Sequence, residues 1–339
     1  MSPRYLARRL VQAVLTILFV VLLNFVLFRM MPGSPERVLL RNPHLTPELI
    51  QAARERWGLD KAKFPISIST DPPSVTFEPE NQLFDFIASS FQGDLGYSLQ
   101  FRGRSVVEVI IERFWPTILL IGLAEIIAIA VGLALGAYTG WRRGGVADRI
   151  GNGLSLILYS MPYFVIGMPL IIIFAAELHW FPTSGMSTPG LATAPLIDQV
   201  IDIGKHTVLP LATISLGLIG GYSILMRSSI IETRAEDYVT TARAKGLSDR
   251  RILTAHAFPN ALLPTVTIVA INLGYVVAGA ITAEIVFNWP GLGTLTVDAL
   301  KARDYPLLQG VFLLLSVTVV FANLFADLLY GVLDPRVRT

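Results

Sequence analysis

The chain has 339 residues, of which 53% are hydrophobic and only 15% are charged. A soluble globular domain carries roughly 25% charged residues, so this composition argues against an ordinary soluble protein. A formal net charge of +2 gives no reason to expect nucleic-acid binding. The absence of cysteine excludes disulfides and thiolate chemistry, and the four histidines are too far apart in sequence to indicate a metal or catalytic cluster.

The N-terminal segment carries Arg4, Arg8 and Arg9 before an apolar run from Leu10 to Met30, which is also how a secretory signal peptide begins. The run reaches the ~20 residues needed to cross a bilayer as a helix. Met31-Pro32-Gly33 does not match the small-residue pattern of a cleavage site. We therefore expect residues 1–30 to form the N-terminus and a retained first membrane helix.

Five further apolar stretches are each long enough to cross ~30 Å of hydrocarbon. They are Trp115–Thr139, Ile150–Ala176, Thr207–Leu225, Ala261–Phe287 and Leu307–Tyr330. One such stretch could be a buried helix of a soluble protein, but six in a chain with so little charge make that alternative poor. We predict an all-α, polytopic protein with six transmembrane helices. Some of these helices should be interrupted by proline, at Pro162, Pro169, Pro210 and Pro264.

The cations indicate an orientation in the membrane. If the N-terminus lies inside, six spans place the C-terminus inside as well, and the short outside loops then hold only Lys205, Lys301 and Arg303. The inside segments hold Arg4, Arg8, Arg9, Arg142, Arg143, Arg149, Arg227, Arg234, Arg243, Lys245, Arg250, Arg251, Arg336 and Arg338. This positive-inside bias predicts cytoplasmic termini and a cytoplasmic loop at 227–260.

Residues 31–114 form a long segment that this orientation places outside the membrane. Pro47–Trp57 is amphipathic and predicts a helix, with Thr46 as its N-cap. The proline-rich stretch Phe64–Pro79 predicts a loop, and Gln82–Phe91 and Ser105–Arg113 predict two short helices. We expect a small extracytoplasmic region here and a membrane core of five helices over 115–339.

Small residues recur four apart within several spans, which lets helix backbones approach closely in lipid. They are Gly132, Gly136 and Gly140, then Gly217 and Gly221, then Gly274 and Ala278. We favour ordinary packing within the chain as their role.

Three acidic residues, Glu125, Glu284 and Asp327, lie inside apolar stretches, where a charge is costly unless it is paired or functional. For Glu125 and Asp327 we favour hydrogen bonds within the chain. Glu284 lies near the outer end of its span. It fits two roles equally well: a residue of a gate or substrate path, or a partner of Asn272, Asn323 or a backbone carbonyl.

The loop Arg227–Asn260 is polar and has the pattern of helix, turn and helix. Gly246 can take the left-handed position that ends the first helix, and Ser248 is a suitable N-cap for the second. Leu247 and Ile252 stand where a hydrophobic staple would join the turn to that helix. A short helix rich in small side chains can enter a groove on a partner protein. A solvated loop explains the same residues, which are Thr240, Thr241, Ala242, Ala244 and Gly246.

This loop resembles the cytoplasmic loop of binding-protein-dependent ABC permeases, whose motif is E-A-A-x3-G-x9-I-x-L-P. Ala242, Gly246 and Pro259 match it literally, and the motif glutamate is replaced by Thr240. T-A-R-A-K-G at 241–246 and N-A-L-L-P at 260–264 are similar to the dipeptide and oligopeptide branch, of the B type.

Three other motifs carry the same resemblance along nearly the whole chain. G-D-L-G-Y-S at 93–98, E-I-V-F-N-W-P-G-L-G at 284–293 and L-D-P-R at 333–336 are similar to conserved features of that branch. Lys61–Asn81 looks like an insertion.

The resemblance implies a non-catalytic permease of a bacterial inner membrane, forming part of the path for di- or oligopeptides. Its partners would be the lipid bilayer, a second homologous permease, two ATP-binding subunits and an extracytoplasmic peptide-binding protein. ATP and Mg would be bound by those ATPases, since the chain has no G-x-x-x-x-G-K-[ST] phosphate loop and so no cofactor of its own. The residues expected to couple to the ATPase are Glu236, Asp237, Thr240, Thr241, Ala242, Arg243, Ala244, Lys245 and Gly246.

Two other classes of function are weighed against this one. A secondary transporter driven by an ion gradient would use the buried acids as ion sites. An intramembrane enzyme would need a nucleophile and base, or a metal constellation, and the sequence offers neither. Within the resemblance, nickel complexes remain an alternative solute to peptides.

Overall fold

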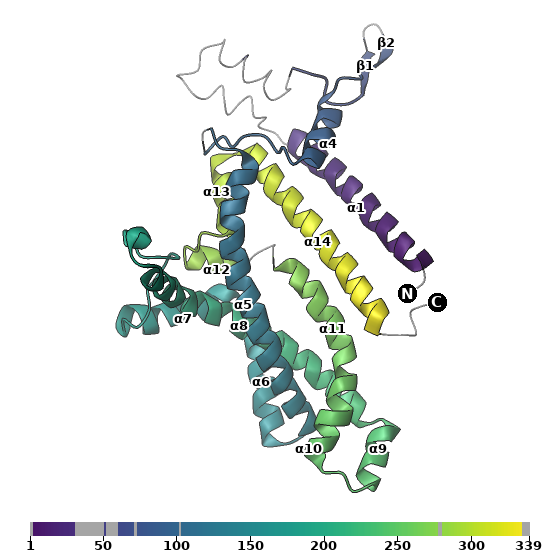
Figure 1. Cartoon of the computed structure of the whole chain (residues 1–339), viewed down its shortest axis with the longest axis vertical. Helices are drawn as coiled ribbons and strands as arrows, with labels where there is room; N and C mark the ends of the chain where they lie inside the picture. Colours follow the sequence, from purple (N-terminus) through teal and green to yellow (C-terminus); the bar gives the residue numbers. More distant parts are fainter. Residues whose placement is uncertain are drawn as a thin grey trace. The chain divides into compact units, whose positions relative to one another are not determined.

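The computed structural model describes residues 3–30, 51, 60–70, 73–101, 103–276 and 280–333. The described chain is helical apart from one β-hairpin (Figure 1). It divides into two compact units, one drawn from 1–10, 114–294 and 321–339 and the other from 11–113 and 295–320. The predicted amphipathic helix at 47–57 lies outside the described residues, apart from Gln51.

Among the described residues, four helices are long and apolar enough to cross a membrane, and they confirm four of the predicted spans. These are α1 (Pro3–Met30), α5 (Val106–Trp141), α8 (Leu196–Arg234) and α14 (Tyr305–Leu333). The helix predicted at Ser105–Arg113 is helical from Val106 on, but it is not a separate short helix. Its residues form the first turns of α5, which begins well before the apolar stretch.

The predicted span Ile150–Ala176 is broken in two. Its first half is α6 (Val146–Ser160), and its second half is α7 (Tyr163–Leu170), which continues as a π-helical segment (Ile171–Glu177); the two halves meet at 101°. The break falls at Met161-Pro162, where both residues are extended because proline disfavours the helical conformation in the residue before it.

The other three prolines expected to interrupt spans do not do so. Pro169, Pro210 and Pro264 lie inside α7, α8 and α11 (Phe258–Tyr275). Membrane helices tolerate such prolines because neighbouring groups and local adjustments satisfy the freed carbonyls.

The predicted span Ala261–Phe287 corresponds to α11 and the short helix α12 (Ile281–Val286), with 277–279 outside the described residues. The described residues give four spans, or five with the bent pair, so the sixth span stays a prediction. The loop before α11 contains α9 (Asp237–Ala244) and α10 (Asp249–Ile252), and a π-helical segment (Leu253–Ala257) joins α10 to α11.

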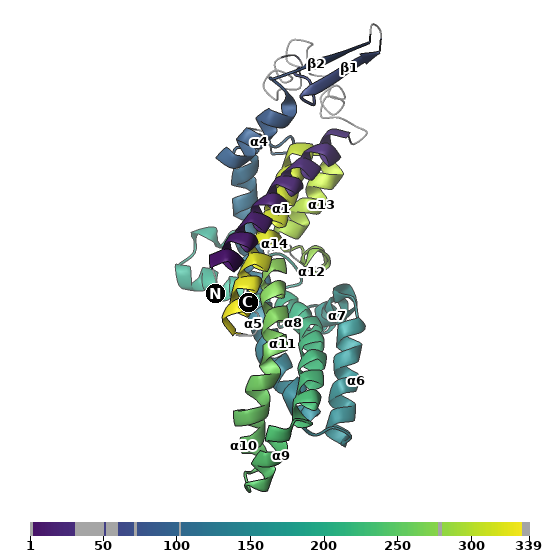
Figure 2. The same cartoon turned by 90° about the vertical axis from the view of Figure 1, so that its right-hand side faces the viewer.

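The glycines of α5 pack this helix directly on α8, which confirms packing within the chain as their role. A Cβ atom added to Gly132 would lie 2.7 Å from Cβ of Tyr222, and one added to Gly136 would lie 2.4 Å from the Ser223 carbonyl oxygen. The helix α8 in turn contacts α6 and α11, and Figure 2 shows these three helices side by side. These contacts make α8 the central helix of its unit.

The other unit contains the hairpin of β1 (Ile66–Thr70) and β2 (Pro73–Phe77), followed by α4 (Gln82–Gln92). The short helix predicted at Gln82–Phe91 is confirmed, whereas the loop predicted at Phe64–Pro79 is wrong. The alternating I-S-I-S-T and S-V-T-F patterns favour strands. The hairpin pairs Ile66 with Phe77 and Ile68 with Val75.

Candidate functional site

The helix α9 ends at Ala244, and Gly246 takes the position after its C-cap, as the sequence predicts. Gly246 has φ +78°, the left-handed conformation. Its amide donates to the Arg243 carbonyl at 2.9 Å, and the amide of Leu247 donates to the Ala242 carbonyl at 3.3 Å. This pair of bonds is a Schellman motif, which satisfies the last carbonyls of the helix and requires a residue that tolerates positive φ.

The turn after Gly246 leads into the helix that becomes α11. Ser248 is the N-cap residue of α10, with extended backbone angles, although its hydroxyl makes no capping hydrogen bond. Leu247 and Ile252 belong to one apolar cluster with Val239 and Ala242, so the predicted hydrophobic contact across the turn is confirmed. Because α10 continues through the π-helical segment into α11, a displacement of α9 would be passed to α11.

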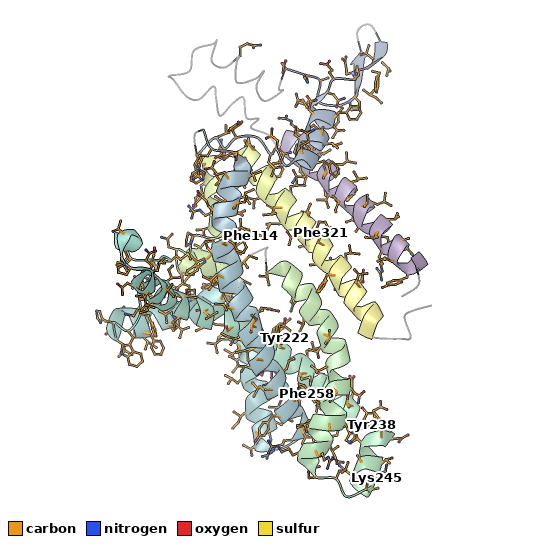
Figure 3. The ribbon with its side chains drawn as sticks, viewed as in Figure 1. Phe114, Tyr222, Tyr238, Lys245, Phe258 and Phe321 are labelled. Carbon is orange, nitrogen blue, oxygen red and sulfur yellow. The ribbon has the colours of Figure 1, made fainter. Side chains whose placement is uncertain are left out.

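The side chains of α9 divide into a buried and an exposed set. Val239 and Ala242 are buried against Ile252, so Ala242 belongs to the packed face of α9 and its side chain does not reach the surface. Tyr238 and Lys245, near the two ends of α9, are labelled in Figure 3. The exposed residues of the expected coupling set are Glu236, Asp237, Thr240, Thr241, Arg243, Ala244, Lys245 and Gly246.

Trp141, the last residue of α5, is the platform on which α9 rests. It packs against the cluster of Val239, Ala242 and Ile252. The guanidinium groups of Arg234 and Arg243 each lie 5.6 Å from its ring centroid, within cation–π range. Arg234 also donates to the Trp141 carbonyl at 2.7 Å. Sequence analysis did not single out Trp141, although an aromatic residue directly before Arg142-Arg143 is typical of a membrane boundary.

Two further groups shape this end of the unit. Asp148 at the start of α6 accepts two hydrogen bonds from Arg227 of α8, at 2.6 and 3.0 Å, which is a bidentate ion pair. On α9, burial raises the pKa of the Tyr238 hydroxyl, so this group is neutral at physiological pH and can donate a hydrogen bond. The ion pair fixes α6 to α8 close to the platform.

Glu284 lies on α12 and is fully enclosed. Its Oε1 accepts from the Thr117 hydroxyl at 2.9 Å, and its Oε2 accepts from the Thr294 amide at 3.0 Å. Thr294 lies in the first turn of α13 (Leu292–Ala302), so the carboxylate caps the start of that helix. Neither Asn272 nor Asn323 is its partner in the described structure.

The glycines that follow Glu284 leave room for this carboxylate. A Cβ atom added to Gly291 would lie 2.4 Å from Glu284 Oε1, and one added to Gly293 would lie 2.8 Å from Oε2. The Glu284 side chain folds back over the turn that follows it. The two glycines of P-G-x-G therefore stand where any larger side chain would collide with the carboxylate. The role of Glu284 in a gate or substrate path stays a prediction, and in this conformation the side chain is 0% exposed.

The G-D-L-G-Y-S motif belongs to the other unit. Like the turn around Glu284, it is held by a buried carboxylate that accepts several hydrogen bonds. Asp304 is buried and accepts hydrogen bonds from the Ser98 hydroxyl at 2.5 Å and from the amides of Leu99 and Gln100 at 2.9 Å each. Gly96, with φ +79°, makes the turn that leads to Ser98. The motif therefore ties the segment before α5 to the loop between α13 and α14, through an aspartate that sequence analysis missed.

Glu125 and Asp327, the other two acidic residues within apolar stretches, also have partners within the chain, as predicted. Tyr222 donates its hydroxyl to the Glu125 carboxylate, and Arg9 pairs with Asp327 at 2.8 Å. Among the described residues, no group of three or more histidine, aspartate or glutamate side chains could hold a metal ion.

Comparisons with known proteins agree with this arrangement. Residues 132–339 match the family "Binding-protein-dependent transport system inner membrane component", and residues 2–121 match the corresponding N-terminal family. A probable peptide ABC transporter permease, y4tP of Sinorhizobium fredii, is 36% identical over 98% of this chain and 99% of its own length. The dipeptide transport permease DppB of Escherichia coli is 36% identical over 99% and 98% of the two chains.

Two more distant matches extend the comparison. The glutathione transport permease GsiC of Escherichia coli is 33% identical over 98% of each chain. The inward-facing MetNI methionine ABC transporter shares the fold, with a TM-score of 0.54 over 67% of this chain and 97% of that one, at 15% identity. The chain therefore belongs to the inner membrane components of binding-protein-dependent transport systems, and is a multi-pass, non-catalytic membrane subunit that works with ATPase subunits and a substrate-binding protein.

Proposed function

We propose that this chain is one of two homologous permease subunits that together form the path for di- or oligopeptides in an ATP-driven importer. The observation that carries the proposal is similarity over nearly the full length to permeases named for peptides and dipeptides, at 36% identity. An extracytoplasmic peptide-binding protein would deliver the solute. Two ATPase subunits would bind ATP and Mg, because this chain has no phosphate loop.

The exposed surface of α9 is the proposed contact with one ATPase. Its fixed end at Gly246 and its platform at Trp141 support the proposal, since a helix that transmits force must be held rigidly at its base. Closure of the ATPase pair would displace α9, and the displacement would pass through α10 to α11 and through Arg234 to α5. Such rigid-body motion is the usual route between inward-open and outward-open states.

We further propose that both termini and 227–260 face the cytoplasm, with 31–114 outside. The distribution of arginine and lysine supports this orientation. Because the chain has no cysteine, a single Ser248→Cys variant can be labelled specifically. We expect it to be protected from a membrane-impermeant maleimide in intact cells and to react after the cells are opened. Reaction from outside intact cells would contradict the orientation.

The functional proposal is tested by reconstituting the purified complex in liposomes and measuring trialanine uptake with and without ATP. We expect uptake to require ATP, the binding protein and the ATPase subunits together. Uptake by this chain alone, driven by an ion gradient, would instead support a secondary transporter. A complex that takes up nickel complexes but no peptide would contradict the proposed solute.

A further inference from the structure

A cavity of about 710 Å³ lies within one unit, between the α6–α7 bend, α8 and α11. This volume is in the range of sites that hold drug-sized ligands. Its lining includes Tyr159, Tyr163, Tyr222, Ser228 and Asn272. Figure 3 labels Tyr222 on α8, beside α5.

The wall of the cavity carries polar groups with unused hydrogen-bonding capacity. The hydroxyls of Tyr159 and Tyr163 make no hydrogen bond to any other residue that the structure describes. Asn272 donates from Nδ2 to the Tyr222 oxygen at 2.9 Å, and its own carbonyl oxygen accepts no hydrogen bond within the described chain. The amide oxygen of Asn272 is therefore available as an acceptor, beside a Tyr222 oxygen that already accepts one hydrogen bond and keeps one lone pair.

Glu125 of α5 lies behind this pair of acceptors. Its side chain is 2% exposed, and its carboxylate accepts the hydroxyl hydrogen of Tyr222. No lysine, arginine or histidine of the described chain forms an ion pair with it. A buried carboxylate without a cation is costly, and the cost falls when a positive group is brought near. The hydrogen bonds from Asn272 to Tyr222 and from Tyr222 to Glu125 thus lead from the cavity wall to a carboxyl group that a bound cation would stabilise in its charged form.

We propose that this cavity binds the transported peptide inside the membrane and that its protonated amino terminus sits against Tyr222 and Asn272. The ammonium group would donate to the Asn272 carbonyl oxygen and to the remaining lone pair of the Tyr222 oxygen, while Glu125 acts through Tyr222 as a positioning residue that stabilises the charge. The free hydroxyls of Tyr159 and Tyr163 would pair with the peptide backbone. This inference deepens the proposed function and rests on it.

Cysteine protection tests the site in the assembled complex. Ser228 is exposed on the cavity wall, and Ser160 is an exposed serine at the end of α6 that does not line it. We expect trialanine to slow maleimide labelling of a Ser228→Cys variant and to leave labelling of the matched Ser160→Cys variant unchanged. Protection by N-acetyl-trialanine should be about tenfold weaker, because it loses a hydrogen bond from a charged donor.

The Glu125→Gln change tests the positioning role, because glutamine still accepts the Tyr222 hydroxyl but carries no charge. We expect it to abolish the preference for trialanine over N-acetyl-trialanine at Ser228→Cys while the complex still assembles. A purely structural glutamate would leave that preference unchanged, which would overturn the role assigned to Glu125. Equal labelling with and without trialanine, in a complex that still imports trialanine, would overturn the cavity site alone. Failure to import any peptide would overturn the proposed function and, with it, this inference.

Discussion

Replacing Gly246 by leucine is the sharpest test of α9 as the helix that couples to the ATPase. The substitution has two physical effects, backbone strain and added bulk at the surface, and the structure separates them. Leucine would be forced into the left-handed conformation at φ +78°, which costs roughly 1–2 kcal/mol. A Cβ atom added there meets nothing within 4 Å, so the fold itself imposes no steric clash. The permease should therefore fold and insert nearly as well as the native chain.

The larger effect is expected at the surface that contacts the ATPase. Overfilling a well-packed contact costs about 1–3 kcal/mol, which corresponds to a roughly 5- to 150-fold loss of affinity. Together with the strain, we expect Gly246→Leu to detach the ATPase or to uncouple ATP hydrolysis from uptake. The assay is ATPase retention during purification, measured in parallel with trialanine uptake in liposomes.

Two matched variants isolate the cause. Gly144 has φ +86° in the turn between α5 and α6 and also has open space around its Cβ position, so Gly144→Leu imposes the same strain away from α9. Gly246→Asn relieves the strain, since asparagine tolerates this conformation, but still adds bulk. Normal uptake with normal ATPase retention in Gly246→Leu would refute the reasoning, as would an equal defect in Gly144→Leu.

Three further substitutions probe the framework, each measured by thermal unfolding of the purified complex. Glu284→Gln places an amide donor where the carboxylate accepts from either the Thr117 hydroxyl or the Thr294 amide, and should cost about 1–3 kcal/mol, lowering the yield of complex. Reduced uptake at unchanged stability would instead indicate a gate. Gly136→Ala puts a methyl group 2.4 Å from a carbonyl oxygen of α8 and should cost about 1–3 kcal/mol, whereas Gly122→Ala on the same helix has open space and should be nearly neutral. Asp304→Asn weakens the buried acceptor of Ser98 and should destabilise by about 1–3 kcal/mol; an unchanged unfolding midpoint would contradict its role as an anchor.

Local features of the fold could be predicted from the sequence because they depend on neighbouring residues. The end of α9 at Gly246 follows from the conformational freedom of glycine, and the contact of Leu247 with Ile252 follows from helix geometry. The bend at Pro162 follows from the restriction that proline places on Met161, the residue before it. The hairpin at 66–77 was hidden because its prolines favour a loop, although the alternating pattern between them favours strands.

The partners of buried polar groups could not be predicted in the same way. Glu284 and Thr117 are 167 positions apart, and Ser98 and Asp304 are 206 positions apart. Hydropathy locates such residues but carries no information about which distant side chain they meet. For the same reason the burial of Ala242 emerged only from the structure, since the small size of a side chain does not reveal which face it occupies.

The central claim, that α9 is the docking element for an ATPase in a peptide importer, is tested most directly by site-specific photo-crosslinking in intact cells. A photoreactive amino acid at Thr241, on the exposed face of α9, should form an adduct with a subunit that carries a G-x-x-x-x-G-K-[ST] phosphate loop. The same probe at Ser160 should form none. An adduct at Ser160 but not at Thr241, or no ATPase adduct from Thr241 in cells that import trialanine, would contradict the claim.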